Sequence, residues 1–415
     1  MLKFIRMQKE RRVMIEKIKE ISKKINLKEH KEIIIATLFF IICPILSLPI
    51  QLYFLFKSEK YRKIYTFYIS VIIGIIYMNA TPTKNFDLYR YYIKMNALQN
   101  FNFNEMLTFI KENSEPLMNI IFYIFANITY RKYIILFTSV IFYNLYFYMF
   151  FDYADKLKLN KKIVNFLIIS FMIANSITET IICIRFSLAA IFLMFAIYVD
   201  MVKNKKQWYY KLLYVIPLLI HNSMFIFLAV RMLMVFNKEK LNKYILTLLI
   251  VASLCPSIII LILKHLPKIP VFVGLMNRLG YLTANVDFNN YKLLTTAINI
   301  AVSILLVDIY RKNPKNKITQ LCILYFIPAI CLIFGVTITE RLYVILIMIM
   351  TFPVMEYYKK IGPKYINKSN FIIYFSFFGC LIFKFRSQII MLNNCNALEP
   401  IMNNMIKNIV SIIIN

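Results

Sequence analysis

Residues 176–223 decide the fold and read SITETIICIRFSLAAIFLMFAIYVDMVKNKKQWYYKLLYVIPLLIHNS. Arg185 stands at the head of one apolar run, and His221 lies between two short apolar runs. An arginine near the hydrocarbon of a bilayer costs about 3 kcal/mol or more, so such residues usually mark a functional site. We therefore interpret the pair as half of an anion-binding active site on the non-cytoplasmic side of a membrane protein.

The composition places the chain among integral membrane proteins. Hydrophobic residues make up 60% of its 415 residues, the mean hydropathy is +0.64, and apolar runs long enough to span a bilayer recur along it. The net charge of +30 does not indicate nucleic-acid binding, because the lysines lie in short loops between apolar runs. The seven cysteines form no CxxC pair and the histidines do not cluster, so we expect no metal site, no cofactor and no disulfide framework.

The basic loops predict the topology. Residues 1–31 are basic, with Met14, Ile18, Ile21 and Ile25 at helical spacing, which predicts an amphipathic helix on the cytoplasmic membrane surface. A solvated tail is the alternative. We expect residues 32–415 to form a single polytopic membrane domain, with outer loops at 81–116 and 264–290. The lysine and arginine clusters expected on the cytoplasmic side are 57–63, 156–162, 203–211, 238–243, 311–317 and 359–368.

Three apolar segments are not predicted to be plain spans. Residues 33–56 contain Pro44 and Pro49, which predict a broken helix. Residues 210–236 begin and end on the same side but are too short for two crossings, so they predict re-entrant half-helices meeting at His221. Residues 117–130 are expected to be a half-helix. The predicted fold is all-α, with about 10–12 spanning or half-spanning helices and a cavity at the outer face.

Ten charged or titratable residues fall on or near the outer face in this topology, where the positive-inside rule predicts the fewest cations. Glu179, Glu340 and Arg386 are three of them, and the other seven are the candidates for a site. A guanidinium binds phosphate oxygens bidentately, and several arginines at one membrane face suit an anionic, lipid-anchored ligand such as a polyprenyl pyrophosphate. The candidates are Asp87, Arg90, Glu115, Arg185, His221, Arg278 and Arg341.

Each candidate also has a structural explanation. Arg185 suits the end of a helix near the interface, and His221 suits a core histidine bonded to a carbonyl oxygen. Asp87 and Arg90 are one helical turn apart and suit a local ion pair, and Glu115-Pro116 suits an ordinary helix start. The remaining alternatives are a salt-bridged helix cap for Arg341 and a solvated loop for Arg278.

The order of several short motifs resembles the EpsG-type and Wzy-type polysaccharide polymerases of bacterial envelopes. The resemblance covers the chain from about residue 33 onward and depends on the following segments: Asp87-Leu88-Tyr89-Arg90-Tyr91-Tyr92, Glu115-Pro116, Ile184-Arg185-Phe186-Ser187-Leu188-Ala189 and His221-Asn222-Ser223. It implies a multi-pass protein of the bacterial plasma membrane with a GT-C-like fold. It also implies transfer of a growing glycan from undecaprenyl pyrophosphate to a lipid-linked repeat unit outside the cytoplasm.

This reaction suggests a role for each candidate. Arg185 and Arg341 would hold the leaving pyrophosphate, with Arg90 and Arg278 as further substrate-binding residues. Asp87, Glu115 and His221 are the candidates for the base that deprotonates the acceptor hydroxyl. Expected partners are the lipid-linked oligosaccharide, membrane lipids, a chain-length regulator and a flippase. The alternatives are an O-antigen ligase, an acyltransferase, and a flippase or transporter, the last disfavoured because no internal repeat is visible.

Overall fold

The fold was taken from a computed structural model of the chain. The residues that the structure describes are 27–78, 84, 87–128, 130–174, 177–236, 302–331, 336–361 and 398–414. Within these ranges the regular structure is helical and no strand occurs, which confirms the all-α prediction. Residues 1–26, the predicted outer loop 264–290 and Arg278 lie outside the described residues.

The predicted broken helix at residues 33–56 is confirmed. Helix α2 spans Leu27–Ile42, and α3 spans Leu48–Lys57 after a turn that contains Pro44. Proline cannot donate a backbone hydrogen bond, so the helix stops before Pro44, and Pro49 lies in the first turn of the next helix, where no such bond is needed. The Gln51 side chain donates to the Ala36 carbonyl oxygen at 2.8 Å and ties α3 to α2.

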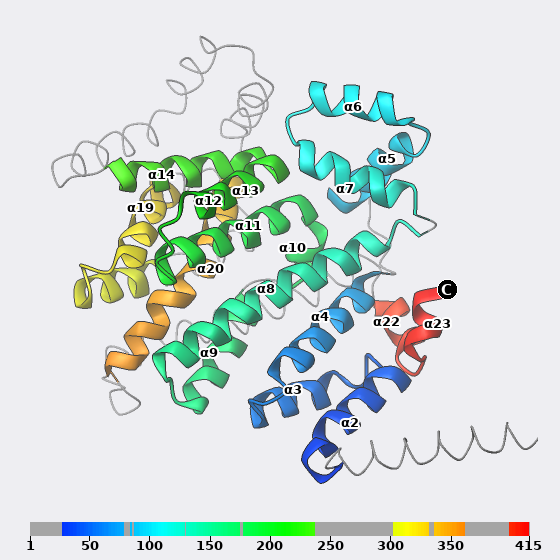
Figure 1. Cartoon of the computed structure of the whole chain (residues 1–415), viewed down its shortest axis with the longest axis horizontal. Coiled ribbons are helices and arrows are strands. Elements are labelled where there is room, and N and C mark those ends of the chain that lie inside the picture. The colour runs from blue at the N-terminus through cyan, green and yellow to red at the C-terminus, as the bar shows by residue number, and fades with distance from the viewer. Residues whose placement is uncertain are drawn as a thin grey trace, which may run out of the picture.

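Helices α4 (Arg62–Met78) and α8 (Tyr133–Leu157) lie side by side along most of their length (Figure 1). Small residues permit this close approach. A Cβ atom at Gly74 would lie 2.7 Å from Cδ1 and 3.0 Å from Cα of Leu136. The Ser139 hydroxyl donates to the Ser70 carbonyl oxygen at 2.8 Å across the same contact.

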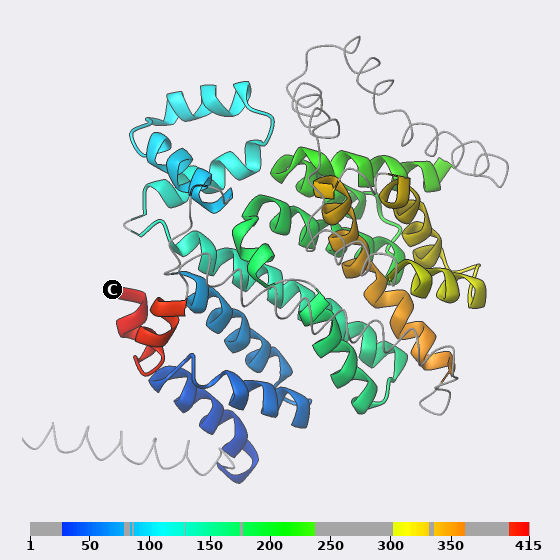
Figure 2. The same cartoon turned by 180° about the vertical axis from the view of Figure 1, so that it is seen from behind.

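Three described helices are long and apolar enough to cross a membrane: Tyr133–Leu157, Ile184–Val202 and Arg341–Lys360. The second joins α11 (Ile184–Ile197) to a π-helical turn at Tyr198–Val202, and the third lies within α20 (Val336–Ile361). Helix α20 packs against α19 (Lys317–Cys331), as Figure 2 shows from behind. Helices α9 (Lys161–Ala174) and α10 (Ile177–Ile182) connect α8 to α11. These apolar helices indicate a membrane protein.

The predicted outer loop 81–116 contains two helices that the sequence analysis did not predict, and its place outside the membrane stays a prediction. It contains α5 (Asp87–Leu98) and α6 (Phe103–Glu112), and Pro116 starts α7 (Pro116–Ala126). The segment can be polar because each of these helices buries only a narrow face. Asn102 and Glu105 form a capping box at the start of α6. Helix α7 is about 16 Å long, which is too short to cross a hydrocarbon layer of about 30 Å.

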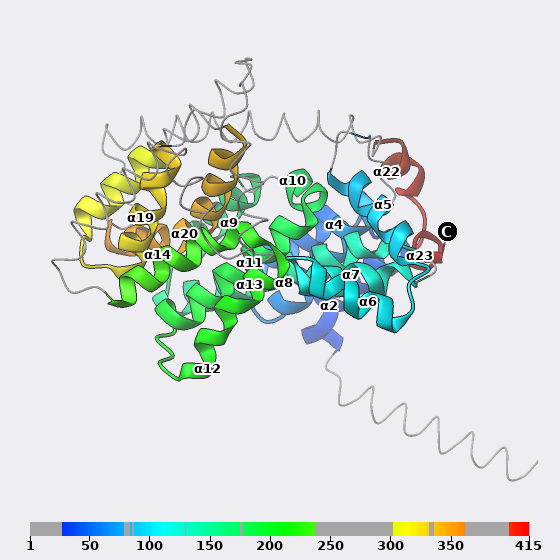
Figure 3. The same ribbon diagram turned by 90° about the horizontal axis from the view of Figure 1, so that it is seen from above.

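Seen from above in Figure 3, α5, α6 and α7 gather near one end of the molecule, and α19 and α20 lie near the other. The C-terminal helices α22 (Leu398–Asn404) and α23 (Ile409–Ile414) pack beside α2 and α4. Ile412 is buried in that contact.

The predicted helix break at His221 is confirmed. Helices α12 (Trp208–Lys211) and α13 (Val215–Ile220) precede it, and α14 (Phe225–Phe236) follows a 3₁₀ turn at Asn222–Met224. His221 itself has extended backbone angles, φ −152° and ψ 116°. The re-entrant course of these helices stays a prediction.

Contacts join several of the basic segments at one end of the bundle. Arg62 forms an ion pair with Asp155 at 2.8 Å, and Lys156 donates to the Val202 carbonyl oxygen at 3.0 Å. Glu356, near the end of α20, accepts hydrogen bonds from Tyr153 and Asn316. Segments predicted to share one side of the membrane are therefore adjacent in space. Their assignment to the cytoplasm stays a prediction.

A crevice with an empty volume of about 460 Å³ lies between α9, residues 302–305 and α20. Its lining is almost wholly apolar and includes Phe166, Phe171, Val302, Leu305, Ile347 and Met350. None of the candidate site residues lines it. The predicted cavity at the outer face therefore stays a prediction.

Candidate functional site

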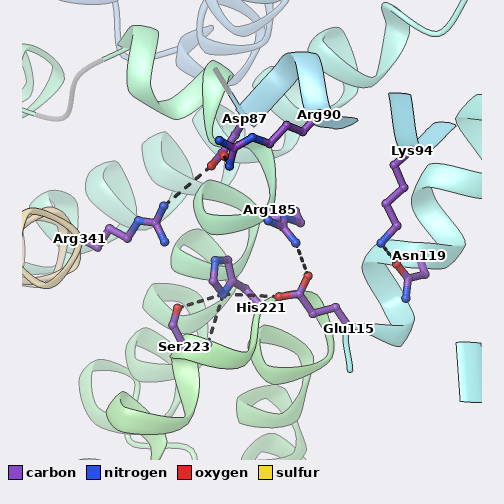
Figure 4. Close-up of polar contacts among 9 residues, drawn as sticks. All are labelled: Asp87, Arg90, Lys94, Glu115, Asn119, Arg185, His221, Ser223 and Arg341. Atoms are coloured by element: carbon purple, nitrogen blue, oxygen red, sulfur yellow. Dashed lines mark hydrogen bonds and ion pairs between the residues drawn. The ribbon is translucent and has the colours of Figure 1, made fainter. Parts of the chain in front are cut away.

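The candidate site is a cluster of charged side chains contributed by four helices and the break at His221 (Figure 4). Asp87, Arg90, Tyr91 and Lys94 recur every three or four residues on α5, so they share one face of that helix. Glu115 immediately precedes α7, Arg185 is in the first turn of α11, and Arg341 is on α20. The cluster therefore combines residues separated by more than half of the chain.

Glu115 and Arg185 form the centre of the cluster. Arg185 Nη1 lies 2.7 Å from Glu115 Oε2, and the two side chains are 24% and 6% exposed. The guanidinium also lies over the ring of Tyr91, 5.0 Å from its centroid, while its Nε atom is buried without a hydrogen-bond partner among the described residues. Burial raises the pKa of the Tyr91 phenol, which keeps this ring neutral beside the arginine.

His221 approaches the same carboxylate from the helix break. Its Nδ1 atom lies 3.8 Å from Glu115 Oε1 and accepts the backbone N–H of Ser223 at 3.2 Å. In the neutral ring this leaves the proton on Nε2, an assignment inferred from the hydrogen bond. The imidazole packs edge-on against Phe186, with ring centroids 5.9 Å apart. His221 is therefore held from two sides.

Asp87 links two further arginines. Its carboxylate lies 3.5 Å from Arg90 on the same helix and 3.8 Å from Arg341 on α20. The Arg341 guanidinium lies 5.8 Å from the Phe186 ring centroid. Phe186 therefore contacts both His221 and Arg341, and it connects the two carboxylate-centred groups.

Six of the seven candidates lie in this one cluster, and Arg278 lies outside the described residues. The structural alternatives are partly realised. Asp87 and Arg90 do form a local ion pair. Glu115 does stand at a helix start, but its side chain makes no capping hydrogen bond and pairs with Arg185 instead.

The candidate residues leave out several members of the cluster: Tyr91, Lys94, Asn119 and Asn222. Lys94 donates to Asn119 Oδ1 at 2.6 Å, and Asn119 lies one turn after Glu115 on α7. Asn222 is 1% exposed, and neither its Oδ1 nor its Nδ2 atom has a hydrogen-bond partner among the described residues. The spacing of Tyr91 and Lys94 from Asp87, four and seven residues, is the sequence signal that identifies their shared face.

Comparison with known proteins agrees with the motif order. The model of the EpsG family matches residues 80–396, a region that contains every residue of the cluster. No curated protein and no solved structure matches the chain.

Proposed function

The chain belongs to the EpsG family, and on that premise we propose that it is a membrane glycosyltransferase that polymerises a surface polysaccharide. The donor is a growing glycan on undecaprenyl pyrophosphate, and the acceptor is a lipid-linked repeat unit on the non-cytoplasmic side of the bacterial plasma membrane. The observation that supports this most is the meeting of Arg185, Arg341 and two carboxylates in one cluster.

The transfer breaks the bond between the anomeric carbon and the pyrophosphate oxygen, and it forms a bond from that carbon to the acceptor hydroxyl oxygen. Negative charge grows on the leaving pyrophosphate, while the hydroxyl proton passes to a base. Fixed positive groups that stabilise such charge are often the largest catalytic contribution. Arg185 and Arg341 supply that charge in the proposal, with Arg90 beside Asp87 as a further cation.

Among the three candidates for the base, Asp87 is favoured by access. Its side chain is 22% exposed, whereas that of Glu115 is 6% exposed and pairs with Arg185 at 2.7 Å. His221 accepts a backbone N–H at Nδ1, so its remaining nitrogen is a donor when the ring is neutral. We assign proton removal to Asp87, positioning of Arg185 to Glu115, and hydrogen-bond donation to the substrate to His221.

The direct test is reconstitution of the purified protein in vesicles with lipid-linked repeat units from its own organism. A ladder of polymer that lengthens with time supports the proposal. Transfer of one glycan onto a different acceptor would identify a ligase, and movement of the lipid between leaflets without a new bond would identify a flippase. Either of these results would replace the proposed function.

The proposal also includes partners. A polymerase that consumes lipid-linked units needs a flippase to deliver them, and a separate regulator can set chain length. Copurification from native membranes, followed by mass spectrometry, tests both associations.

A further inference from the structure

Lys94 differs from the other cations of the cluster in its partners. Arg185 pairs with Glu115, and Arg90 and Arg341 both face Asp87. The described contacts of the Lys94 ammonium are the neutral Asn119 side chain, at 2.6 Å, and the faces of two aromatic rings, Phe109 and Phe122, at 5.3 and 5.6 Å. Rings and an amide hold the ammonium in position but do not neutralise it.

The surroundings of Lys94 make its charge costly. Its pKa is lowered to about 8 by burial and by the nearby Arg185 guanidinium, and Glu115 offsets this only in part. A cation that is destabilised in this way gains from a bound anion, which supplies the missing counter-charge.

A second polar group beside Lys94 also lacks a partner. Asn119 is 1% exposed, and because its Oδ1 atom accepts from Lys94, its Nδ2 group is a donor. That Nδ2 atom is buried without a hydrogen-bond partner among the described residues. A buried donor left unpaired costs about 1–3 kcal/mol, so a ligand oxygen at this position would relieve two costs together.

The charges of the cluster indicate the class of ligand. Four cations (Arg90, Lys94, Arg185 and Arg341) and two carboxylates (Asp87 and Glu115) leave two positive charges when Lys94 is protonated. A pyrophosphate joined at both ends carries one ionised oxygen on each phosphorus, so its charge equals this excess.

We propose that Lys94 is a substrate-binding residue, whose ammonium pairs with an ionised phosphate oxygen of the same pyrophosphate that Arg185 holds. In Figure 4, Lys94 and Arg341 lie on opposite sides of Arg185. The pyrophosphate therefore binds between these cations, with Asn119 Nδ2 as a neutral donor at one side. This inference rests on the proposed function, because it assigns a residue to the same site.

The test is binding of labelled undecaprenyl pyrophosphate to the full-length protein in phosphatidylcholine nanodiscs. We expect Lys94→Met to raise Kd at least tenfold, equivalent to about 1.4 kcal/mol, and Lys94→Arg to leave Kd within about threefold of the wild type. Lys111→Met is the matched control, since Lys111 is exposed in the last turn of neighbouring α6. It loses the same charge and should bind as the wild type does.

The pH dependence of Kd gives a second measurement that a structural role would not produce. Lys94 binds the anion when protonated, so wild-type affinity should fall about tenfold between pH 7 and pH 9, as the pH passes a pKa of about 8. Lys94→Arg should show no such fall. The neighbouring charged residues are Asp87 on α5, Glu115 before α7 and Arg185 on α11. Burial raises the pKa of the Tyr91 and Tyr92 phenols, so both phenols stay neutral in this pH range.

The outcomes separate the two proposals. If the wild type binds the pyrophosphate lipid and Lys94→Met binds it equally well, the role of Lys94 is overturned. If the wild type binds undecaprenyl pyrophosphate no better than undecaprenol, the proposed function itself is overturned. Should Lys94→Met fail to fold, the comparison of wild type with Lys94→Arg across pH decides, and identical pH profiles would overturn the role of Lys94.

Discussion

Two of the long helices carry charged side chains at both ends, and the partners of these side chains differ between the end near the basic loops and the end at the cluster. Arg185 and Asp200 lie at opposite ends of the Ile184–Val202 segment, and Arg341 and Glu356 lie at opposite ends of α20, each pair about 22 Å apart along the helix. At the end with the basic loops, carboxylates accept from phenols, as in Tyr153 with Glu356, Tyr198 with Asp152, Tyr214 with Asp200 and Tyr357 with Asp308.

At the other end, Glu115 and Asp87 face guanidinium groups, and buried donors of Arg185, Asn119 and Asn222 have no hydrogen-bond partner among the described residues. The basic end also has carboxylate–guanidinium pairs, such as Arg62 with Asp155, and one such donor, Arg62 Nε. A phenol satisfies a carboxylate and leaves little for a ligand to improve. Unused donors and paired cations leave hydrogen bonds that a substrate anion can take. The comparison agrees with a structural role for the charges near the basic loops and with the proposed substrate-binding role of the cluster.

The largest expected effect comes from Arg185→Lys. This change keeps the charge but loses the planar fork that contacts Glu115 and faces the pyrophosphate, so polymerisation should fall at least 100-fold, or about 3 kcal/mol. The polymer ladder measures this, and Arg231→Lys at the other end is the matched control, expected to keep polymerisation. Normal chain length in Arg185→Lys would remove the arginine from the reaction.

Arg231→Met should instead lower stability. Arg231 donates from Nε and Nη2 to Asp200 at 2.9 and 2.5 Å, and both side chains are only 14% exposed. Leaving Asp200 without its cation should lower the free energy of unfolding by about 3 kcal/mol. Thermal unfolding in detergent measures the loss, and Asp200→Asn in the same chain should restore part of it. Polymer made per folded molecule should not change; a loss of polymer would show that this end also serves catalysis.

A smaller loss of stability is expected for Gly74→Ala. The added methyl group would meet Leu136 at 2.7 Å and Ser139 Cβ at 3.2 Å, so α4 and α8 must separate slightly. Overpacking of this kind costs about 2 kcal/mol. No residue of the cluster lies on α4 or α8, so the unfolding temperature should fall without a change in polymer length. An unchanged unfolding temperature would show that α4 and α8 accommodate the methyl group without a loss of stability.

The smallest expected effect is that of Asn222→Leu, which tests whether a buried polar residue of the cluster serves the fold or the site. Asn222→Leu removes two buried polar atoms that have no partner among the described residues, which should raise the free energy of unfolding by about 1 kcal/mol. Polymerisation should fall if Asn222 contacts the substrate. A loss of stability together with full activity would show that Asn222 belongs to the fold rather than to the site.

A residue could be predicted from the sequence where it differs in polarity from the residues around it. Arg185 and His221 interrupt apolar runs, so their unusual position was visible without coordinates, and Pro44 and the break at His221 were equally clear. Lys94 lies in a polar segment where a lysine is ordinary, and its burial depends on α6 and α7 folding over it. The helices α5 and α6 escaped prediction for the same reason.

Pairing across distant elements was the other limit. Asp200 and Arg231 are not among the residues that the sequence analysis singled out, yet the two form an ion pair, and the Tyr214 hydroxyl accepts a hydrogen bond from Arg231 Nε. Asp200 lies in the π-helical turn that follows α11, and Arg231 lies on α14, so spacing along the chain does not reveal that the two meet. Likewise, the pairing of Glu115 with Arg185 spans 70 residues.

The division of the cluster between two groups of helices has a mechanical consequence. Helices α5 and α7 carry Asp87, Tyr91 and the carboxylate beside Pro116, whereas α11, α20 and the break carry the arginines and the imidazole that face them. All four contacts join the α5–α7 unit to the helices on the other side, so a small tilt of that unit would lengthen all four together. A ligand bound among these side chains would therefore be coupled to the angle between the α5–α7 unit and the helices that face it.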